Sequence, residues 1–476
     1  MPSQRALLPR SAPAASGVSS RAIAALLDRF EARSVECHSL MVVRHGHVVA
    51  EGWWAPYSAG RPRLLYSLTK SFTSVAAGLA IADGLLSLED RVVDVLPGHV
   101  PADVSERGRR LTVHHLLSMT TGHRADSLAE AWELEPGDLV RGFLRVPFPE
   151  AEGTLHAYDN ATTFVLARMV ERVTGRDLPE LLDERLFTPM GIEHAEWDRV
   201  ASGAAFGFHG LHLTTEAVAA FGELLLREGL WGGRRLVPRE WVRLATRRHV
   251  ETPQVEGWSE NPDALCGYGY QFWMSRHGYR GEGAFGQMCL VVPSHDLVVA
   301  VTGAVPHGEA ILDPLWECLL PGMDQAGSTR DDEILAERLR RLSLAPMPGS
   351  AAPERSAEAR LDASAGDSAL PGGTTVIVDP VDGGWLLRLG TSLDVEAGHG
   401  EWRESSPLGR PVVATGAWQG DTFVADLYVI TTAHRVRLVV DAGAGTAVAT
   451  WNTVPLTGPD LVLHLRSPLM TRPDVA

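Results

Sequence analysis

The sequence predicts an α+β domain followed by a small antiparallel β-barrel or sandwich domain. At 476 residues the chain is too long for one core, because single cores stop growing at roughly 250 to 300 residues. Strand-like runs lie on both sides of a long helical region, which requires one sheet assembled from distant segments, an α/β or α+β arrangement. The composition changes near Pro346, and short β-rich runs follow it.

The first domain is predicted over residues 20–345, and it begins with a helix. Apolar residues at helical spacing predict this helix over Ser20–Arg33. Two Val-rich runs around His45-Gly46-His47 predict a β-hairpin with both histidines in its turn. Helical patterns dominate from about Ser67 to Arg248. Strand-like runs return at GYGYQFWM, MCLVVP and LVVAVTG, before a short helical segment, ILDPLWECLL.

A linker is predicted over residues 346–372, because this stretch is rich in Pro, Gly, Ala and Ser and has few side chains able to pack. The second domain is predicted over residues 373–470. Its β-rich runs are separated by turn residues, and they are TTVIVDP, GWLLRLG, TFVADLYVITT, HRVRLVVD, TAVATWNTV and LVLHLR.

Composition excludes several classes of function. A net charge of −16 repels phosphate backbones and anionic lipid surfaces, so neither nucleic acid nor a membrane is an expected partner. Four cysteines without paired or metal-type spacing predict reduced thiols. The N-terminus lacks the apolar run of a signal peptide, and no segment approaches 18 uninterrupted apolar residues. We therefore expect a soluble, cytoplasmic protein.

Only one of the 43 basic residues is a lysine, Lys70, in the run YSLTKSFTS. Lysine can lose its proton when desolvated, whereas arginine cannot. Three residues separate Ser67 from Lys70, which places both on one face of a helix that begins near Ser67. The amine is then able to take the hydroxyl proton and create a nucleophile, and the helix start favours an oxyanion. The alternative is that Ser67 only caps its helix.

A second candidate group precedes another apolar-periodic helix. Tyr158 is placed to relay a proton, and Asn160 to hold a substrate carbonyl or the lysine. The alternatives are that Tyr158 is packing and that Asn160 caps the helix. Among the histidines, His123 is interpreted as an exposed loop residue. A structural interpretation is also favoured for His209 and His212, which have no carboxylate or cysteine at ligand spacing.

Taken in order, the motifs YSLTKSFTS, LTVHHLLSMTTGH, YDN and GAFGQMCLVVP resemble those of the serine hydrolases related to class C β-lactamases and penicillin-binding proteins. The resemblance covers about residues 20 to 322. It implies a helical subdomain against an antiparallel sheet covered by helices, with the active site at their junction.

The resemblance also implies roles for single residues. Ser67 would be the acylated nucleophile, Lys70 its base, Tyr158 the proton relay and Asn160 a substrate-positioning amide. The third motif of the family would fall at Ala284-Phe285-Gly286. Gly286 would then contact substrate, and the backbone N–H groups of Ser67 and Gln287 would form the oxyanion hole.

The third motif departs from the family pattern, which reads Lys-Thr-Gly or His-x-Gly. Ala284 supplies no cation to bind a substrate carboxylate. This favours esters or amides that lack a carboxylate beside the scissile bond over β-lactams and carboxypeptidase substrates. Arg276, His277 and Arg280, a few residues upstream, are the alternative sources of a cation.

Three hypotheses of function follow. The first is a serine hydrolase that cleaves a small-molecule or peptidyl ester or amide without a metal or organic cofactor. The second is a penicillin-binding-type thioesterase or peptide cyclase whose substrate arrives on a carrier protein. The third is a catalytically silent binding protein with the same fold. For the serine hydrolase, the C-terminal domain resembles the lipocalin-like appendages of some family members, and it is expected to wall the cleft or shape acyl selectivity.

Overall fold

The computed structural model describes residues 6–200, 203–252, 261–352, 354–362 and 366–466. They divide into two compact units. The first unit holds the chain up to Gly52 and Leu64–Arg340. The second holds Trp53–Arg63 and the described chain from Arg341 on.

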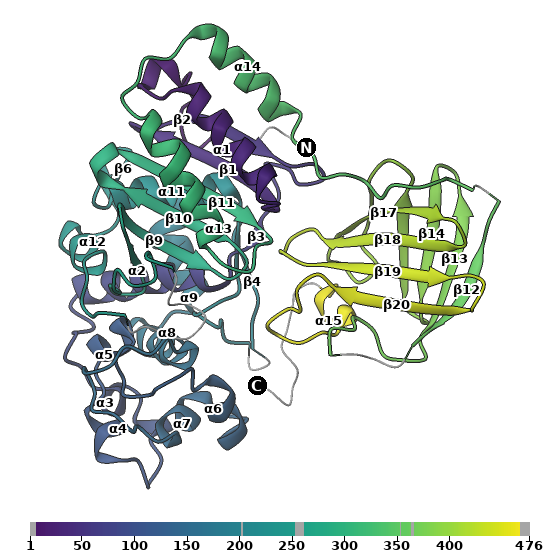
Figure 1. Cartoon of the computed structure of the whole chain (residues 1–476). Helices are drawn as coiled ribbons and strands as arrows, with labels where there is room; N and C mark the ends of the chain where they lie inside the picture. Colours follow the sequence, from purple (N-terminus) through teal and green to yellow (C-terminus); the bar gives the residue numbers. More distant parts are fainter. Residues whose placement is uncertain (1–5, 201–202, 253–260, 353, 363–365, 467–476) are drawn as a thin grey trace. The chain divides into compact units, whose positions relative to one another are not determined.

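A six-stranded sheet forms the centre of the first unit, in the order β2-β1-β11-β10-β9-β8 (Figure 1). The pairs β1–β11, β11–β10, β10–β9 and β9–β8 are antiparallel. Their bounds are Cys37–Arg44 for β1, His47–Trp53 for β2, Trp273–Ser275 for β8, Gly278–Gly283 for β9, Gln287–Val292 for β10 and Leu297–Gly303 for β11. The predicted assembly of one sheet from both ends of the domain is confirmed.

Helices cover this sheet because its central strands are apolar on both faces. Every residue of β1, β10 and β11 is buried. Helix α11 (Thr215–Leu226) packs on these three strands. Its Gly222 permits close approach, since a Cβ there would lie 2.4 Å from a methyl group of Val298. Helix α1, predicted over Ser20–Arg33, spans Ser20–Ala32 and packs on α13 (Glu309–Pro314) and α14 (Thr329–Arg340).

The remaining α-helices of the first unit, α2 to α10 and α12, are mostly short. Their bounds are Thr69–Ala82 for α2, Val92–Val95 for α3, Glu106–Arg110 for α4, Val113–Ser118 for α5, Leu128–Leu134 for α6, Leu139–Arg145 for α7, Asn160–Thr174 for α8, Leu178–Leu182 for α9, Thr188–Met190 for α10 and Arg239–Ala245 for α12. Short strands are Arg63–Leu64 (β3), Glu196–Trp197 (β4), Leu211–Leu213 (β5), Leu230–Trp231 (β6) and Arg234–Arg235 (β7). Among the described residues, no helix is long and apolar enough to cross a membrane.

The second unit is a closed β-barrel, as the fold-class prediction allowed (Figure 1). Eight strands close because β15 pairs with both β14 and β17, while β16 (Arg403–Ser405) adds to β17 outside the ring. The eight are β12 (Ala357–Leu361), β13 (Thr375–Val381), β14 (Gly384–Leu389), β15 (Leu393–Gly398), β17 (Val412–Gln419), β18 (Thr422–Val429), β19 (Arg435–Asp441) and β20 (Thr446–Trp451). Helix α15 (Leu461–His464) follows them.

Alternating burial along the strands directs one set of side chains into the barrel. These side chains form one apolar core that includes Trp385, Trp418 and Phe423. Strand β12 lies inside residues 346–372, the predicted linker. Its inward residues include Ala357 and Ala359, which are too small to mark a strand by hydrophobicity. The lipocalin-like role of this unit stays a prediction.

Trp53–Arg63 joins the barrel unit although it lies inside the predicted continuous domain 20–345. Tyr57 packs with Val413, Tyr428 and Ile430 of the barrel. The Arg63 guanidinium lies 4.1 Å from the centre of the Tyr57 ring and donates a hydrogen bond to the Thr432 carbonyl at 2.7 Å. The barrel unit is therefore built from two separate stretches of chain.

Candidate active site

Ser67 lies in a 3-10 turn, Tyr66–Leu68, that leads directly into α2. The turn places Ser67 just before the helix, so Leu68 occupies the cap position that the sequence had offered to Ser67. Apolar side chains at helical spacing along this segment are buried: Leu68, Phe72, Val75 and Leu79. Ser67 itself is half-buried, which leaves its hydroxyl within reach of a substrate.

Two glycines of β9 allow this strand to run close beside the turn. A Cβ on Gly283 would lie 1.9 Å from the Leu65 carbonyl oxygen, and a Cβ on Gly281 would lie 2.3 Å from a methyl group of Leu68. Neither position has room for a side chain. The strand segment next to Ser67 is therefore Gly281–Gly283.

Lys70 is buried in the first turn of α2, with 1% of its surface exposed. Its Nζ lies 3.0 Å from Ser67 Oγ, 2.6 Å from Asn160 Oδ1 and 3.1 Å from the Phe208 carbonyl oxygen. Burial lowers the pKa of Lys70 to about 7, although the charges of Asp126 and Asp159 oppose this shift. A large share of Lys70 is thus a neutral amine at neutral pH, the form able to accept a proton.

Tyr158 completes a hydrogen-bonded group with Ser67 and Lys70. Its side chain is hydrogen-bonded to Ser67, and Lys70 Nζ lies 4.7 Å from the centre of its ring. The ring stacks on Trp273 at a centroid distance of 5.7 Å. Burial raises the pKa of Tyr158, so the phenol keeps its proton at neutral pH and is able to donate it.

Asn160 is the first residue of α8, and its amide contacts Lys70 rather than capping the helix. Asp159 is the N-cap, since its carboxylate accepts a hydrogen bond from the Ala161 N–H. The same carboxylate accepts hydrogen bonds from Ser127 and is paired with His123 at 2.9 Å. Of the two contacts expected for this amide, the structure has the one with Lys70, and the substrate contact stays a prediction. The sequence did not single out the neighbouring carboxylate.

Ala284, Phe285 and Gly286 form the turn between β9 and β10. Phe285 and Gly286 both have positive φ values, 65° and 85°. The Gln287 side chain donates hydrogen bonds to the carbonyls of Ala284, Phe285 and Gly303. The substrate contact of Gly286 and the oxyanion role of Gln287 stay predictions.

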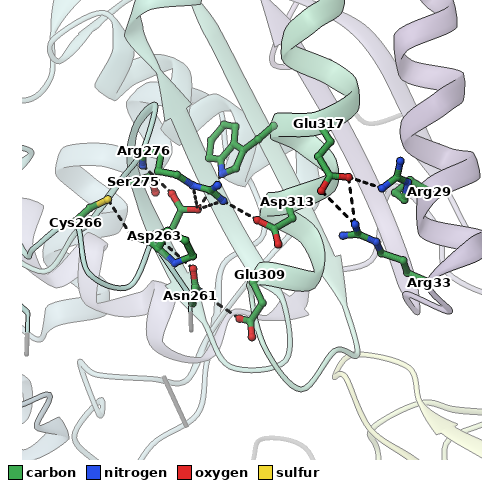
Figure 2. Close-up of polar contacts among 12 residues, drawn as sticks. Arg29, Arg33, Asn261, Asp263, Cys266, Ser275, Arg276, Glu309, Asp313 and Glu317 are labelled. Carbon is green, nitrogen blue, oxygen red and sulfur yellow. Dashed lines mark hydrogen bonds and ion pairs between the residues drawn. The ribbon is translucent and has the colours of Figure 1, made fainter. Parts of the chain in front are cut away.

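The two arginines upstream of this turn, Arg276 and Arg280, are paired with carboxylates of the protein. Arg276 bonds to Asp263 at 2.9 Å through Nε and to Asp313 at 2.6 Å through a terminal nitrogen (Figure 2). Arg280, 2% exposed, bonds to Glu282 at 2.6 Å. These contacts argue against either arginine replacing the missing third-motif cation.

His123 is buried, and its interpretation as an exposed loop histidine is wrong. Its ring stacks on Phe148 at 4.4 Å and is paired with Asp159. Gly122, at φ +100°, lets the loop turn inward, because a Cβ there would lie 2.4 Å from the Glu150 carbonyl oxygen. The partners of His123 are 25 and 36 residues away in the chain, so no local pattern reveals them.

Gln271 joins the helices that carry the site, and the sequence did not single it out. Its backbone carbonyl accepts from Ser71 of α2, and its Oε1 accepts from Thr163 of α8. Its Nε2 donates to the carbonyls of Leu116 and Leu117 in α5. Gln271 is 2% exposed, and its φ of +64° ends the extended run that GYGYQFWM had predicted.

We expect Gln271→Ala to lower the free energy of unfolding by about 2–4 kcal/mol, because buried polar groups on two helices lose their partners. Alanine and glutamine meet a similar backbone cost at positive φ, so the change reports on the side chain. Chemical denaturation of both proteins measures the effect. Exposed Gln325→Ala is the control, and equal losses for the two variants would contradict this role.

Within the described residues, no group of three or more His, Cys, Asp or Glu side chains is arranged to hold a metal ion. His212 instead lies beside a buried carboxylate, with its Nε2 3.1 Å from Asp198 Oδ2. The groups that contact Ser67 are an amine and a phenol, and an amide contacts the amine. This arrangement is able to activate a hydroxyl by proton transfer.

Comparison with known proteins agrees with this chemistry. Residues 22–315 match the family described as Beta-lactamase. The chain is 23% identical over 305 residues to a putative D-alanyl-D-alanine carboxypeptidase of Escherichia coli, covering 52% of this chain and 70% of that protein. It is 26% identical over 288 residues to the 6-aminohexanoate-dimer hydrolase of Paenarthrobacter ureafaciens, covering 56% and 72%.

A third relative, esterase EstB of Burkholderia gladioli, is 31% identical over 178 residues, which cover 32% of this chain and 44% of the esterase. Among solved structures, a putative 6-aminohexanoate-dimer hydrolase from Bacillus anthracis superposes with a TM-score of 0.53 at 19% identity. That alignment covers 67% of this chain and 87% of the other, and it supports the fold of the first unit.

Proposed function

Because the chain belongs to the beta-lactamase family, we propose that it is a serine hydrolase that cleaves an ester or amide through an acyl-enzyme on Ser67. The observation that carries the proposal is the contact between a buried Lys70 and the Ser67 hydroxyl, at 3.0 Å. The pKa of Lys70, about 7, suits a base that works at neutral pH.

The proposed reaction begins when Lys70 takes the proton of the Ser67 hydroxyl. Ser67 Oγ then attacks the substrate carbonyl, and backbone N–H groups of the turn hold the oxyanion. Tyr158 passes a proton to the leaving group and regains one from the protonated Lys70, so the leaving group departs as an alcohol or amine and Ser67 is left acylated. Water attacks the acyl carbonyl in the second half-reaction and releases the acid and the free serine.

We infer that the preferred substrate has no carboxylate beside the scissile bond. Ala284 supplies no cation, and Arg276 and Arg280 are each paired with carboxylates of the protein. Rings from Tyr158, Trp273 and Tyr268 pack together on one side of the site, which favours an apolar acyl or leaving group. The esterase and amide-dimer hydrolase relatives fit this inference better than the carboxypeptidases do.

A fluorophosphonate tests the covalent step. We expect the intact mass of the wild type to rise by one phosphonyl group, and peptide mapping to place that group on Ser67. Ser74→Ala, which removes a hydroxyl from the helix that follows Ser67, is expected to label like the wild type. A folded wild type that forms no adduct would contradict the proposal and favour a silent binding protein.

A matched pair of esters tests the inferred substrate class. We expect kcat/KM for phenyl butyrate to exceed that for 3-(butyryloxy)benzoate by about tenfold or more, because the second ester carries a carboxylate on its leaving group that would lose its hydration without gaining a cation. An equal or higher value for the charged ester would overturn this inference while leaving the covalent step intact.

A further inference from the structure

We propose that Asp126 is a positioning residue that fixes the amide of Asn160 and thereby aims the lone pair of Lys70 at Ser67. The inference deepens the proposed function and rests on Lys70 acting as the base. Asp126 lies in the loop between α5 and α6 and is exposed at the edge of the site, whereas Lys70 is buried. The two are connected through Asn160.

The contacts of Asp126 determine which way the Asn160 amide faces. One carboxylate oxygen accepts the backbone N–H groups of Asn160 at 3.0 Å and Leu128 at 3.1 Å. The other accepts Asn160 Nδ2 at 2.5 Å. A carboxylate accepts hydrogen bonds and cannot donate them, so the NH2 group of Asn160 must face Asp126. Asn160 Oδ1 is left facing Lys70, at 2.6 Å.

This orientation matters because a neutral amine has two N–H groups and one lone pair. Asn160 Oδ1 and the Phe208 carbonyl oxygen are both hydrogen-bond acceptors, and they take the two N–H groups. The lone pair is then directed at the third neighbour, the Ser67 hydroxyl. If the amide turned over, its NH2 group would face the amine and compete for the lone pair.

Asp126 also acts on Lys70 through its charge. The groups facing Lys70 are the carboxylates of Asp126 and Asp159, of which Asp159 is also paired with His123, and the Tyr158 phenol. Glu282 acts on Tyr158 from β9. The charge of Asp126 raises the pKa of Lys70 against the effect of burial. Removing that charge is therefore expected to lower the pKa.

The experiment uses Asp126→Asn and Asp126→Ala in the full chain. Because Lys70 is the only lysine, protein labelled with ¹³C-lysine gives a single side-chain signal whose pH titration reports the pKa of this amine. We expect the titration midpoint to fall by about one pH unit in both variants. We also expect kcat for a neutral activated ester to fall about 10- to 100-fold in Asp126→Ala with little change in KM. Asp126→Asn keeps one acceptor oxygen, so its loss should be smaller.

Asp103→Asn is the matched control, because this exposed carboxylate lies in the same helical region and only approaches Arg145 at 3.7 Å. An unchanged titration midpoint, or an unchanged kcat at saturating ester, would overturn the proposal. A rise in KM alone would show that Asp126 binds substrate instead. The NMR titration needs no turnover, so a wild type that fails to label with fluorophosphonate would defeat the proposed function without hiding the effect of Asp126 on Lys70.

Discussion

Replacing Ser67 with alanine is expected to lower kcat/KM for an activated ester by about 10⁴- to 10⁶-fold. The variant keeps Lys70, Tyr158 and Asn160 but has no atom able to form the acyl bond. Any remaining rate would come from water attacking an ester held in the site. Steady-state hydrolysis of p-nitrophenyl butyrate measures the loss. The enzyme concentration must be high enough to detect the small remaining rate.

Ser74→Ala is the control for this change, since it also removes a hydroxyl from the helix of Lys70. We expect it to retain activity within about threefold of the wild type, as remote substitutions usually do. Ser67→Ala should unfold at the same temperature as the wild type, because its hydroxyl is only half-buried. Activity within tenfold of the wild type in Ser67→Ala would exclude Ser67 as the nucleophile.

Lys70→Arg is expected to lower kcat/KM by about 10²- to 10⁴-fold, the usual contribution of a general base. Arginine keeps the positive charge but does not lose its proton in proteins, so the variant separates proton transfer from charge. In the wild type, kcat/KM should rise as the pH increases through about 7, because only neutral Lys70 accepts a proton. This rise should be absent from the variant. A pH profile from 5 to 9 with and without Lys70 tests both expectations.

Lys70→Met provides a control for folding. The pKa of Lys70 falls from 10.5 to about 7 on folding, so the unfolded chain binds more protons than the folded chain between these values. The contribution of Lys70 to the free energy of unfolding therefore increases as the pH rises from about 7 to about 10.5. At pH 7, replacing the buried amine with an apolar side chain should raise the melting temperature while activity is lost. A lower melting temperature together with a loss of activity would indicate that the variant misfolds.

The contacts around Ser67 were predictable because their signals are local. Ser67 and Lys70 lie one turn apart, so spacing alone predicts their contact. Tyr158 and Asn160 stand together at the start of a helix whose apolar period is plain in the sequence. Asp126 gave no such signal, because its function depends on a hydrogen bond to an amide 34 residues further along the chain.

Contacts between residues far apart in the chain could not be predicted for the same reason. Gln271 bonds to residues of three helices, the most distant of them 200 positions earlier in the chain. Ala284-Phe285-Gly286, where the third motif is expected, forms a turn because Phe285 and Gly286 have positive φ values, and sequence patterns did not reveal this turn. The strand beside Ser67 is instead marked by the glycines Gly281 and Gly283, a pattern that hydrophobic periodicity overlooks.

Because the internal segment Trp53–Arg63 is part of the barrel unit, the barrel cannot be gained or lost as a simple C-terminal extension of the gene. A domain that is only appended to a chain can be lost by one stop codon, because all of its residues lie beyond that codon. A stop codon near position 345 would remove Tyr428 and Thr432 but leave Tyr57 and Arg63, the residues that contact them. The barrel and this internal segment are thus expected to be inherited together, so recombination between relatives would have to exchange both stretches at once.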